Sequence, residues 1–351
     1  MLLDAGSQFC LIFYSLNLGG ASQSIRRRTK MTMRKVTGLG LYIIAILALF
    51  SPARGADRLT LSSTNPTALE IDQMVAREKG FFARENIDLD VTYMTPDLVI
   101  KALLAGAVDL SRSGAHFGLI AAARGGEIKI IGGSTYGYPY QVIGQPQLKS
   151  LAELKGQKVA AASLASITTT IFKDVMQRQG IPPTAYTLLF VGGSPERFQA
   201  VSSGQVAASL AEAPPFNFRS IDAGRKVLLN YSDEIKNLLY TAYFASNKAL
   251  AQNRGLLTRF MRAMGQAMRW LNDPANEKAV IEIMMQRLKI DEATAERTYK
   301  FMVPENKAFR GEGAIDVAGL TEMIRLLTAD QMIPKREPWE TFVDSSFPTI
   351  K

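Results

Sequence analysis

The sequence predicts an α/β protein of two Rossmann-like lobes joined by two crossings of the chain. Three observations support this prediction. The 351 residues, 47% of them apolar and 21% charged, are typical of a globular protein and can form two cores of about 100 to 150 residues each. One β-α-β-α-β pattern occurs twice, about 100 residues apart, which indicates two similar units. An apolar segment near the N-terminus has the pattern of an export signal, so we expect the folded part to begin after it.

The predicted export signal starts at Met31 or Met33, where we expect translation to begin. A short basic region precedes an apolar run at residues 39–50, and the small residues around Gly55 suit cleavage. Twelve apolar residues rise about 18 Å as a helix, against about 30 Å of hydrocarbon core, so a permanent membrane anchor is the weaker alternative. A twin-arginine signal at residues 26–28 is a further alternative, but the apolar residues that should follow the arginine pair are missing.

Cleavage after Gly55 removes most of the positive charge of the chain. The whole sequence has a formal charge of +9, and the mature part keeps 34 of its 41 basic and 31 of its 32 acidic residues. No basic run survives, which argues against nucleic acid and anionic membranes as partners. Cys10 lies upstream of the cut and no cysteine stands at it. We therefore expect a monomer without disulfides, free in the periplasm and not lipid-anchored.

The first unit alternates strands and helices that end at glycines. Its expected elements are a strand at 59–62, a turn at 64–67, a helix ending at Gly80, a strand near 89–93, a helix over 97–105 and a strand at 108–111. The β-α-β-α-β order predicts parallel strands with right-handed crossovers.

The second unit repeats this order. Its expected elements are a strand at 158–162, a helix ending at Gly180, a strand at 187–191, a helix ending at Gly204 and a strand at 206–210. Val75 and Gly80 recur as Val175 and Gly180, and Ala102, Gly106, Val108 and Ser111 recur as Ala200, Gly204, Val206 and Ser209. Glycine enters the left-handed helix cap without steric cost, so its recurrence marks the helix ends. Chance recurrence of such glycines is the alternative.

These patterns divide the mature chain into lobe 1, residues 56–140 and 241–351, and lobe 2, residues 141–240. A strand at 141–143 is expected to cross from the first lobe to the second, and residues 240–246 to return. Amphipathic patterns then predict helices at 256–271 and 277–288. We interpret their methionines, at positions 261, 264, 268, 284 and 285, as core residues.

From Leu59 to the C-terminus the chain resembles a known family. The segments that carry the resemblance are Val75-Ala76-Arg77-Glu78-Lys79-Gly80-Phe81-Phe82, residues 102–110 (ALLAGAVDL) and residues 151–159 (LAELKGQKV). They resemble substrate-binding proteins of ABC transporters of the nitrate/taurine/sulfonate type, a group that includes binders of thiamine-pyrimidine precursors. One departure is Ala207, where the family often has an acidic residue. This departure puts in doubt a ligand contact or a strand-end cap at that position, but not the fold.

The resemblance implies a type II periplasmic-binding-protein fold that closes around a ligand by hinge motion. It implies that the chain is the periplasmic component of an ABC importer, working with a membrane permease and a cytoplasmic ATPase. The ligand classes that remain open are sulfonates, nitrate-like anions, carboxylates and heteroaromatic compounds. A ligand sensor that docks on a receptor is an alternative, and the presence of neighbouring permease and ATPase genes would discriminate between the two.

The candidate ligand-binding residues lie in loops at predicted strand ends, where open α/β sheets bind their ligands. In lobe 1 they are Thr64, Asn65, Thr67, Ser113, Gly114, Ala115 and His116, and in lobe 2 they are Ser163, Ser166, Thr168, Thr169, Gly193, Ser194, Glu212 and Pro214. The hydroxyl groups of residues 163–169 stand at a helix N-terminus, which favours an anion. Helix capping is the alternative role for these hydroxyls and for Asn65. Tyr136 and Tyr138 can stack on a flat ligand or pack in the hinge.

Enzyme motifs are missing from the sequence. It has no P-loop, no H-E-x-x-H, no G-x-S-x-G and one histidine, so we expect neither catalysis, nor a metal, nor a cofactor. The enzyme alternative is a thiamine-pyrimidine-synthase relative that uses histidine and pyridoxal phosphate, but its cysteine-rich motif is missing here. Arg112 and Arg197 stand near predicted strand ends, and surface placement is the default for arginine.

Overall fold

The computed structural model describes residues 55–64, 67–164, 166–211, 214–235 and 237–347. The chain divides into a unit of residues 1–54 and a unit of residues 55–351, and the second unit contains both sheets. The predicted export signal, Cys10, Asn65 and Glu212 lie outside the described residues. In the part of the chain that is described, no helix has the length and apolarity needed to cross a membrane.

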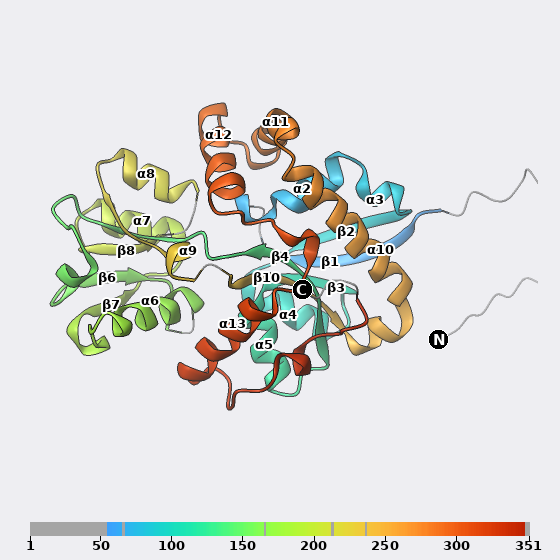
Figure 1. Ribbon diagram of the computed structural model, residues 1–351, viewed down its shortest axis with the longest axis horizontal. Helices are drawn as coiled ribbons and strands as arrows, with labels where there is room; N and C mark the ends of the chain where they lie inside the picture. Colours follow the sequence, from blue (N-terminus) through green and yellow to red (C-terminus); the bar gives the residue numbers. More distant parts are fainter. Residues whose placement is uncertain (1–54, 65–66, 165, 212–213, 236, 348–351) are drawn as a thin grey trace, which may run out of the picture. The chain divides into compact units, whose positions relative to one another are not determined.

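The first sheet has five strands in the order β2-β1-β3-β10-β4 (Figure 1). The bounds are β1 (Asp57–Ser63), β2 (Ile87–Tyr93), β3 (Leu110–Gly114), β4 (Ile128–Tyr136) and β10 (Leu239–Ser246). β1 pairs in parallel with β2 and β3, whereas β10 runs antiparallel to both β3 and β4. The sheet is therefore mixed, although its first three strands are parallel as predicted. We call this sheet and the helices that pack on it lobe 1.

The second sheet, the base of lobe 2, has the order β7-β6-β8-β5-β9. Its strands are β5 (Gln141–Gly144), β6 (Lys158–Ala161), β7 (Thr187–Phe190), β8 (Ala208–Ala211) and β9 (Lys226–Asn230). β6 is parallel to β7 and β8, and β5 is antiparallel to β8 and β9. Position by position, this sheet repeats the first one, with β5 in the place of β10.

The repeat extends to single residues. Ser62 of β1 pairs with Ser111 of β3, and Ala160 of β6 pairs with Ser209 of β8. Gly80, Gly106, Gly180 and Gly204 all have φ between +70° and +77°, the left-handed region in which glycine avoids a steric penalty. The recurrence seen in the sequence therefore reflects two copies of one unit.

The helices cover both faces of each sheet, as Figure 1 shows. The α-helices are α2 (Ile71–Glu78), α3 (Phe81–Arg84), α4 (Pro96–Leu104), α5 (Ala115–Ala123), α6 (Ile167–Arg178), α7 (Ser194–Ser202), α8 (Phe216–Asp222), α9 (Tyr231–Glu234), α10 (Asn247–Leu271), α11 (Glu277–Leu288), α12 (Glu292–Lys300) and α13 (Val317–Ala329). The shorter helical turns are η1 (Ala68–Glu70), η2 (Leu151–Leu154), η3 (Pro183–Ala185), η4 (Pro274–Asn276), η5 (Phe301–Glu305), η6 (Gly311–Gly313) and η7 (Trp339–Phe342).

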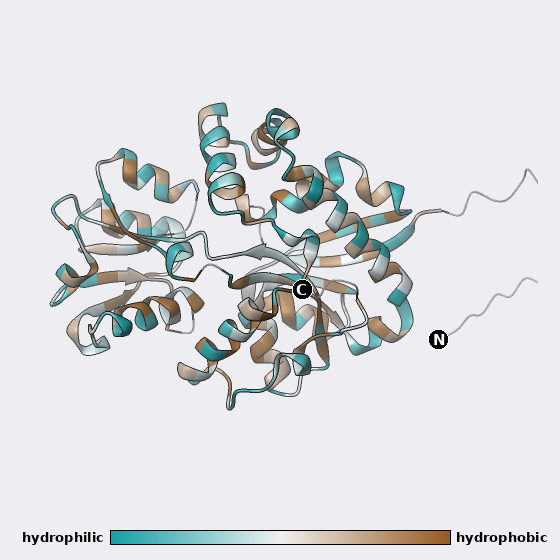
Figure 2. Ribbon diagram, viewed as in Figure 1, coloured by the Kyte–Doolittle hydropathy of each residue, from teal (hydrophilic) through white to brown (hydrophobic). Residues whose placement is uncertain are grey.

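The predicted helices of the C-terminal part are present. α10 and α11 contain the amphipathic segments 256–271 and 277–288, and Figure 2 shows hydrophobic and hydrophilic residues together on these helices. Four of the five methionines, at positions 261, 264, 268 and 284, are buried, and the fifth is packed against the core. Their interpretation as core residues is confirmed.

Some sequence predictions about crossings and strands are wrong. Residues 240–246 do not return between the lobes; they belong to β10, which lies between β3 and β4 and pairs with both. The return crossing is the segment between β9 and β10, residues 231–238. Residues 141–143 do not cross between the lobes either; they belong to β5, which pairs with β8 and β9, and the first crossing is residues 137–140. The third strand runs over 110–114 instead of 108–111, because its last residue pairs with Thr241 of β10. The predicted lobe boundaries stay a prediction.

Candidate ligand-binding cleft

A cavity of about 640 Å³ lies between the two lobes, at the carboxyl ends of β1, β3 and β6. Its walls also include the N-terminal turns of α5, α6 and α7, the first crossing and the start of β10. The lining residues are Thr64, Thr67, Leu69, Met94, Thr95, Arg112, Ser113, Gly114, His116, Phe117, Tyr138, Tyr140, Ala162, Ser163, Ser166, Ile167, Thr168, Gly192, Gly193, Ser194, Arg197, Tyr240 and Thr241. Pockets of about 300 to 1,000 Å³ hold small-molecule ligands, so this cavity has the size of a binding site.

The structure brings most of the sequence-predicted site residues to this cavity. Those that line it are Thr64, Thr67, Ser113, Gly114, His116, Tyr138, Ser163, Ser166, Thr168, Gly193 and Ser194. Apart from Tyr138 in the first crossing, they come from four strand ends, those of β1 and β3 in lobe 1 and of β6 and β7 in lobe 2. Whether each residue contacts a ligand stays a prediction.

Four other predicted residues do not line the cavity. Tyr136 is 2% exposed, and its hydroxyl donates to the carbonyl of Ala314 within lobe 1. Ala115 is fully buried at the start of α5, and Thr169 donates to the Ser163 carbonyl at 2.8 Å. Pro214 lines a separate pocket. For Tyr136 and Thr169, therefore, the structure shows packing and a local hydrogen bond in place of the expected position in the cleft.

The lobe 1 wall carries two buried polar atoms that have no partner among the described residues. These are the Oγ of Ser113, a residue 1% exposed, and the Nδ1 of His116, a residue 4% exposed. Burial lowers the pKa of His116 from 6.5 to about 3, so the imidazole is neutral at physiological pH. Gly114 lies against this ring, because a Cβ at position 114 would be 2.6 Å from the His116 Cε1. Unpaired buried polar atoms are costly, which indicates that a ligand or water completes them.

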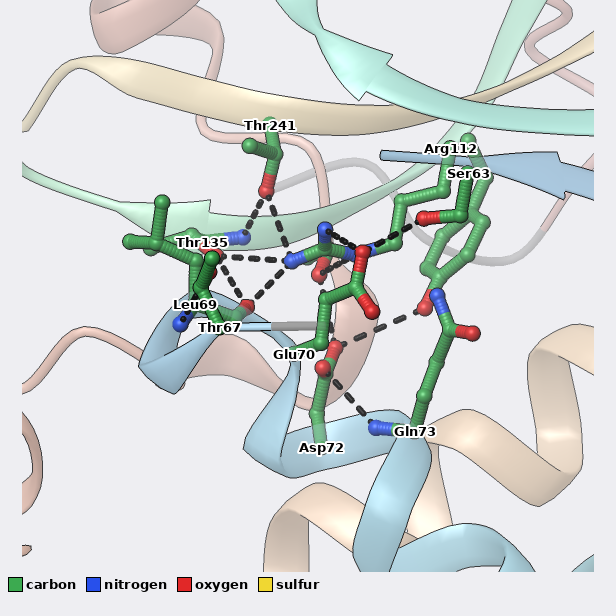
Figure 3. A network of polar contacts seen from close by, with 11 residues as sticks. Ser63, Thr67, Leu69, Glu70, Asp72, Gln73, Arg112, Thr135 and Thr241 are labelled. Carbon is green, nitrogen blue, oxygen red and sulfur yellow. Dashed lines mark hydrogen bonds and ion pairs between the residues drawn. The ribbon is translucent and has the colours of Figure 1, made fainter. Parts of the chain in front are cut away.

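Arg112 is fully engaged by the protein, as Figure 3 shows. The side chain is 2% exposed, and its Nε donates to the Ser134 Oγ at 2.9 Å. Nη1 lies 3.3 Å from the Glu70 Oε1. Nη2 donates to the Leu69 carbonyl, to the Thr135 Oγ1 at 3.3 Å and to the Thr241 Oγ1 at 3.4 Å. The default surface placement of Arg112 is therefore wrong, because distant segments supply acceptors that the sequence around it does not reveal.

Two buried carboxylates face this guanidinium. Burial raises the pKa of Glu70 from 4.5 to about 7, while Arg112 and a 2.6 Å hydrogen bond from Ser63 act in the opposite direction. Burial also raises the pKa of Asp72, which accepts from the Ser134 Oγ at 2.6 Å. The positive charge of Arg112 is thus compensated inside lobe 1 and is not left for a ligand.

Arg197 differs from Arg112 in its partners. It is 5% exposed in α7, and its guanidinium donates to the Leu210 carbonyl at 2.6 Å, the Gly192 carbonyl at 2.8 Å and the Ser194 Oγ at 3.0 Å. All three acceptors are neutral, and no ion pair involves Arg197 within the described part of the chain. Surface placement is wrong here as well. The apolar positions around Arg197 on α7 could have indicated its inward direction.

Tyrosines from both crossings pack together at the hinge. The rings of Tyr138 and Tyr140 stack with centroids 4.4 Å apart, and Tyr240 meets Tyr138 edge-on at 4.7 Å. Tyr231 meets Tyr138 edge-on at 5.5 Å. Tyr140 and Tyr240 hydroxyls are 2.8 Å apart. Of the two roles predicted for Tyr138, hinge packing is what these contacts show, although the residue also lines the cavity.

The N-terminus of α6 lies at the cleft and is not capped by a side chain. Ser166 is the N-cap of α6, but its side chain makes no capping hydrogen bond. The neighbouring Thr168 Oγ1 lies 2.6 Å from the Tyr138 hydroxyl, a contact that joins lobe 2 to the first crossing. Within the described residues, no group of histidine, cysteine, aspartate and glutamate side chains could hold a metal ion.

The acidic residue that lobe 2 lacks has a structural role in lobe 1. Asp109 is the counterpart of Ala207, and its Oδ2 accepts from the Thr60 backbone N–H at 3.0 Å and from the Thr60 hydroxyl at 2.7 Å. Asp109 does not line the cleft. In lobe 2 the backbone bond alone remains, from the Ala207 N–H to the Lys158 carbonyl at 2.9 Å. With alanine at position 207, lobe 2 therefore lacks the side-chain hydrogen bonds that join these strands in lobe 1, and the cleft loses no lining residue.

Comparison with known proteins gives consistent matches. A family model described as NMT1/THI5 like matches residues 71–277. A relative from Brucella abortus (strain 2308), named provisionally as a binding protein, is 24% identical over 229 residues, which are 64% of this chain and 70% of the relative.

Solved structures with the same fold include two binding proteins and an enzyme. The alkanesulfonate-binding protein SsuA from Xanthomonas axonopodis pv. citri bound to MOPS has a TM-score of 0.67 at 18% identity, covering 83% of this chain and 99% of that one. The periplasmic aliphatic sulphonate binding protein SsuA from Escherichia coli has a TM-score of 0.68 at 16% identity, covering 82% and 92%. The desulfurization enzyme DszB has a TM-score of 0.60 at 15% identity, covering 83% and 97%. These likenesses confirm the two-lobed periplasmic-binding-protein fold.

Proposed function

Because the chain belongs to the NMT1/THI5-like family, we propose that it is the solute-binding component of an ABC importer. In this role it holds a small organic or anionic solute between its lobes and presents the closed form to a membrane permease. The observation that carries the proposal is the cavity itself, since residues from facing strand ends of both lobes line it and buried polar atoms within it have no protein partner among the described residues. Such a site is built to be completed by a ligand.

The names of the structural neighbours support the proposal. One SsuA is named as an alkanesulfonate-binding protein and another as a periplasmic sulphonate-binding protein. We propose for this chain the same compartment, reached through the cleaved signal predicted before residue 56, and a monomer without a lipid anchor. A permease and its ATPase are the proposed partners.

Hinge closure is the step that links binding to transport in this proposal. A ligand shifts the balance between open and closed forms only if it binds the closed form more tightly, which requires contacts to both lobes. Several protein contacts already bridge the lobes here. Lys173 of α6 lies 2.9 Å from the Asp330 carboxylate beyond α13, and Arg325 of α13 lies 3.0 Å from Asp174. A ligand would add its own bridge to these.

An enzymatic role is less well supported. DszB shares the fold, so the fold alone does not exclude catalysis. His116 is the single histidine of the sequence, and its Nδ1 has no acidic or nucleophilic partner among the described residues. A catalytic histidine needs such a partner to be oriented and activated. The cleft therefore supports binding better than turnover.

The test measures ligand binding and closure in the mature protein purified after export from cells that express the full chain. Thermal unfolding would be followed with sulfonates, carboxylates, nitrate and pyrimidines, and small-angle scattering would follow closure. A ligand at 100 times its Kd should add about 2.7 kcal/mol to the free energy of unfolding. A compound that raises the melting temperature and contracts the molecule supports the proposal. No response to any class would contradict it.

A further inference from the structure

We propose that the ligand is an organic anion with an apolar body and an uncharged polar end. Its negative group binds Arg197 in lobe 2, and its uncharged end binds Ser113 and His116 in lobe 1. This inference rests on the proposed function, because it assigns the chemistry of the solute that the cleft takes.

The charged side chains among the described lining residues of the cleft are both basic. Arg112 and Arg197 are the charged side chains among the described lining residues, and no aspartate or glutamate is among them. Arg112 is paired with Glu70 at 3.3 Å, so its charge is compensated from within lobe 1. Arg197 is held by neutral oxygens alone. The described lining therefore carries one uncompensated buried positive charge, and burying a charge without a partner is costly.

The surroundings of Arg197 suit an anion further. The guanidinium lies at the N-terminal end of α7, where the dipole of the helix adds positive potential. A guanidinium also binds carboxylate and sulfonate groups through parallel hydrogen bonds. An anionic group beside Arg197 supplies the countercharge that the described lining residues do not provide.

The opposite wall fixes the other end of the ligand. Ser113 and His116 offer a hydroxyl and a ring nitrogen without partners among the described residues, and both residues are at least nine-tenths buried. The pKa of His116, lowered to about 3 by burial, keeps the ring uncharged. A neutral hydroxyl group fits both, since it can donate one hydrogen bond and accept another. An ammonium group finds no carboxylate among the described lining residues, so zwitterions are disfavoured.

The volume of the cleft and its apolar lining residues set the size and polarity of the ligand body. Leu69, Met94, Phe117 and Ile167 line it together with the hinge tyrosines, and the cavity measures about 640 Å³. A nitrate-sized ion fills only a small part of this volume. An apolar body that spans the cleft contacts both lobes at once, which is the condition for closure.

The experiment is calorimetric titration of the mature protein with matched probes. The probes are 4-hydroxyphenylacetate and 6-hydroxy-2-naphthoate, the neutral amide of each, the analogue of each that lacks the hydroxyl, nitrate and taurine. We expect at least one hydroxylated anion to bind, and its amide to bind about 30-fold more weakly or worse, because a buried charge pair is lost. Analogues of the two hydroxylated probes with a sulfonate in place of the carboxylate test whether the affinity depends on the type of anionic group.

Variants assign the two ends. Arg197→Met should weaken the anion about 30-fold or more and leave the amide nearly unchanged, whereas Arg58→Met removes an equal charge at an exposed site and should change neither. Ser113→Ala should weaken the hydroxylated anion more than the analogue without the hydroxyl. If Arg197→Met does not fold, the comparison of anion with amide in the unchanged protein still decides the assignment of charge.

Several outcomes would overturn the inference. They are equal binding of anion and amide, unchanged anion affinity in Arg197→Met, or tightest binding of nitrate or taurine. If no probe binds but another solute raises the melting temperature and closes the molecule, the ligand class is wrong and the proposed function stands. If no solute of any class produces either response, both are wrong.

Discussion

Replacing Arg112 by methionine removes the guanidinium that faces two buried carboxylates of lobe 1 (Figure 3). The replacement keeps an unbranched apolar stem but leaves Glu70 and Asp72 without their cation. The hydroxyl of Ser134 and the carbonyl of Leu69 also lose a donor. Breaking a buried ion pair by removing one partner costs about 3 to 5 kcal/mol, so we expect a loss of this size in the free energy of unfolding at pH 7.

The pH dependence gives the prediction a second signature. The pKa of Glu70 is raised from 4.5 to about 7 in the folded protein, so its contribution to stability is full below pH 4.5 and is lost as the pH rises to 7. Above pH 7 this contribution levels off in the unchanged protein, because Glu70 is then ionised in both states. Without Arg112 the folded pKa rises further. The free energy of unfolding should therefore keep falling by about 1.4 kcal/mol per pH unit above pH 7.

The assay is urea unfolding of the mature protein at pH 5, 7 and 8.5, followed by circular dichroism. The exposed Arg58→Met variant is the matched control and should stay within about 0.5 kcal/mol of the unchanged protein. Adding Glu70→Gln to Arg112→Met should remove most of the extra slope above pH 7. A loss below about 1 kcal/mol at pH 7, or a slope equal to that of the unchanged protein, would refute the description of Arg112 as the countercharge of this cluster.

Three further predictions concern other parts of the fold. Gly319→Ala places a Cβ 1.6 Å from the carbonyl oxygen of Asn237 in the return crossing, so thermal unfolding should show a loss of about 3 kcal/mol or more; Gly255→Ala, with open space around its Cβ, should be neutral or stabilising. His116→Gln removes a group whose pKa is lowered from 6.5 to about 3 in the folded protein, so its contribution to the free energy of unfolding is full above pH 6.5 and is lost as the pH falls toward 3. The free energy of unfolding of the variant, measured by acid titration, should therefore fall less steeply between pH 6.5 and 3. An unchanged pH profile would argue against a buried neutral ring. Asp109→Ala removes the clamp on the first strand and should cost about 1 to 3 kcal/mol in urea unfolding while ligand affinity stays unchanged; a large affinity loss would mean that this acid acts on the cleft.

The repeated architecture could be predicted from the sequence because its signals are local. A glycine such as Gly106 or Gly204 ends a helix through its own backbone, and the strand that follows it is short and apolar. The loops after strands β1 and β6 can be located from the same repeated order of strands and helices. These signals need no knowledge of distant residues, so the strand-end residues of the cleft, Ser113 and Ser166 among them, could be named in advance.

The burial of Arg112 could not be predicted in this way. Arg112 is buried because Glu70 and Ser134, which lie far from it in the sequence, supply its acceptors. The prediction of the return crossing at residues 240–246 is wrong for a related reason, since an apolar run of this kind suits a central strand as well as a crossing. Which role such a run takes is decided by its pairing with β3 and β4, and pairing is a property of the folded chain.

The hinge tyrosines make the two crossings a single mechanical element. The first crossing contributes Tyr138 and Tyr140 and the second leads into Tyr240, and the rings and hydroxyls hold these strands of chain together. The 2.8 Å contact between the Tyr140 and Tyr240 hydroxyls joins the end of the first crossing to the end of the second. We expect the two crossings to bend together, which would restrict closure of the lobes to one rotation. A permease that reads the distance between the lobes would then receive one variable, and that variable reports whether the cleft is occupied.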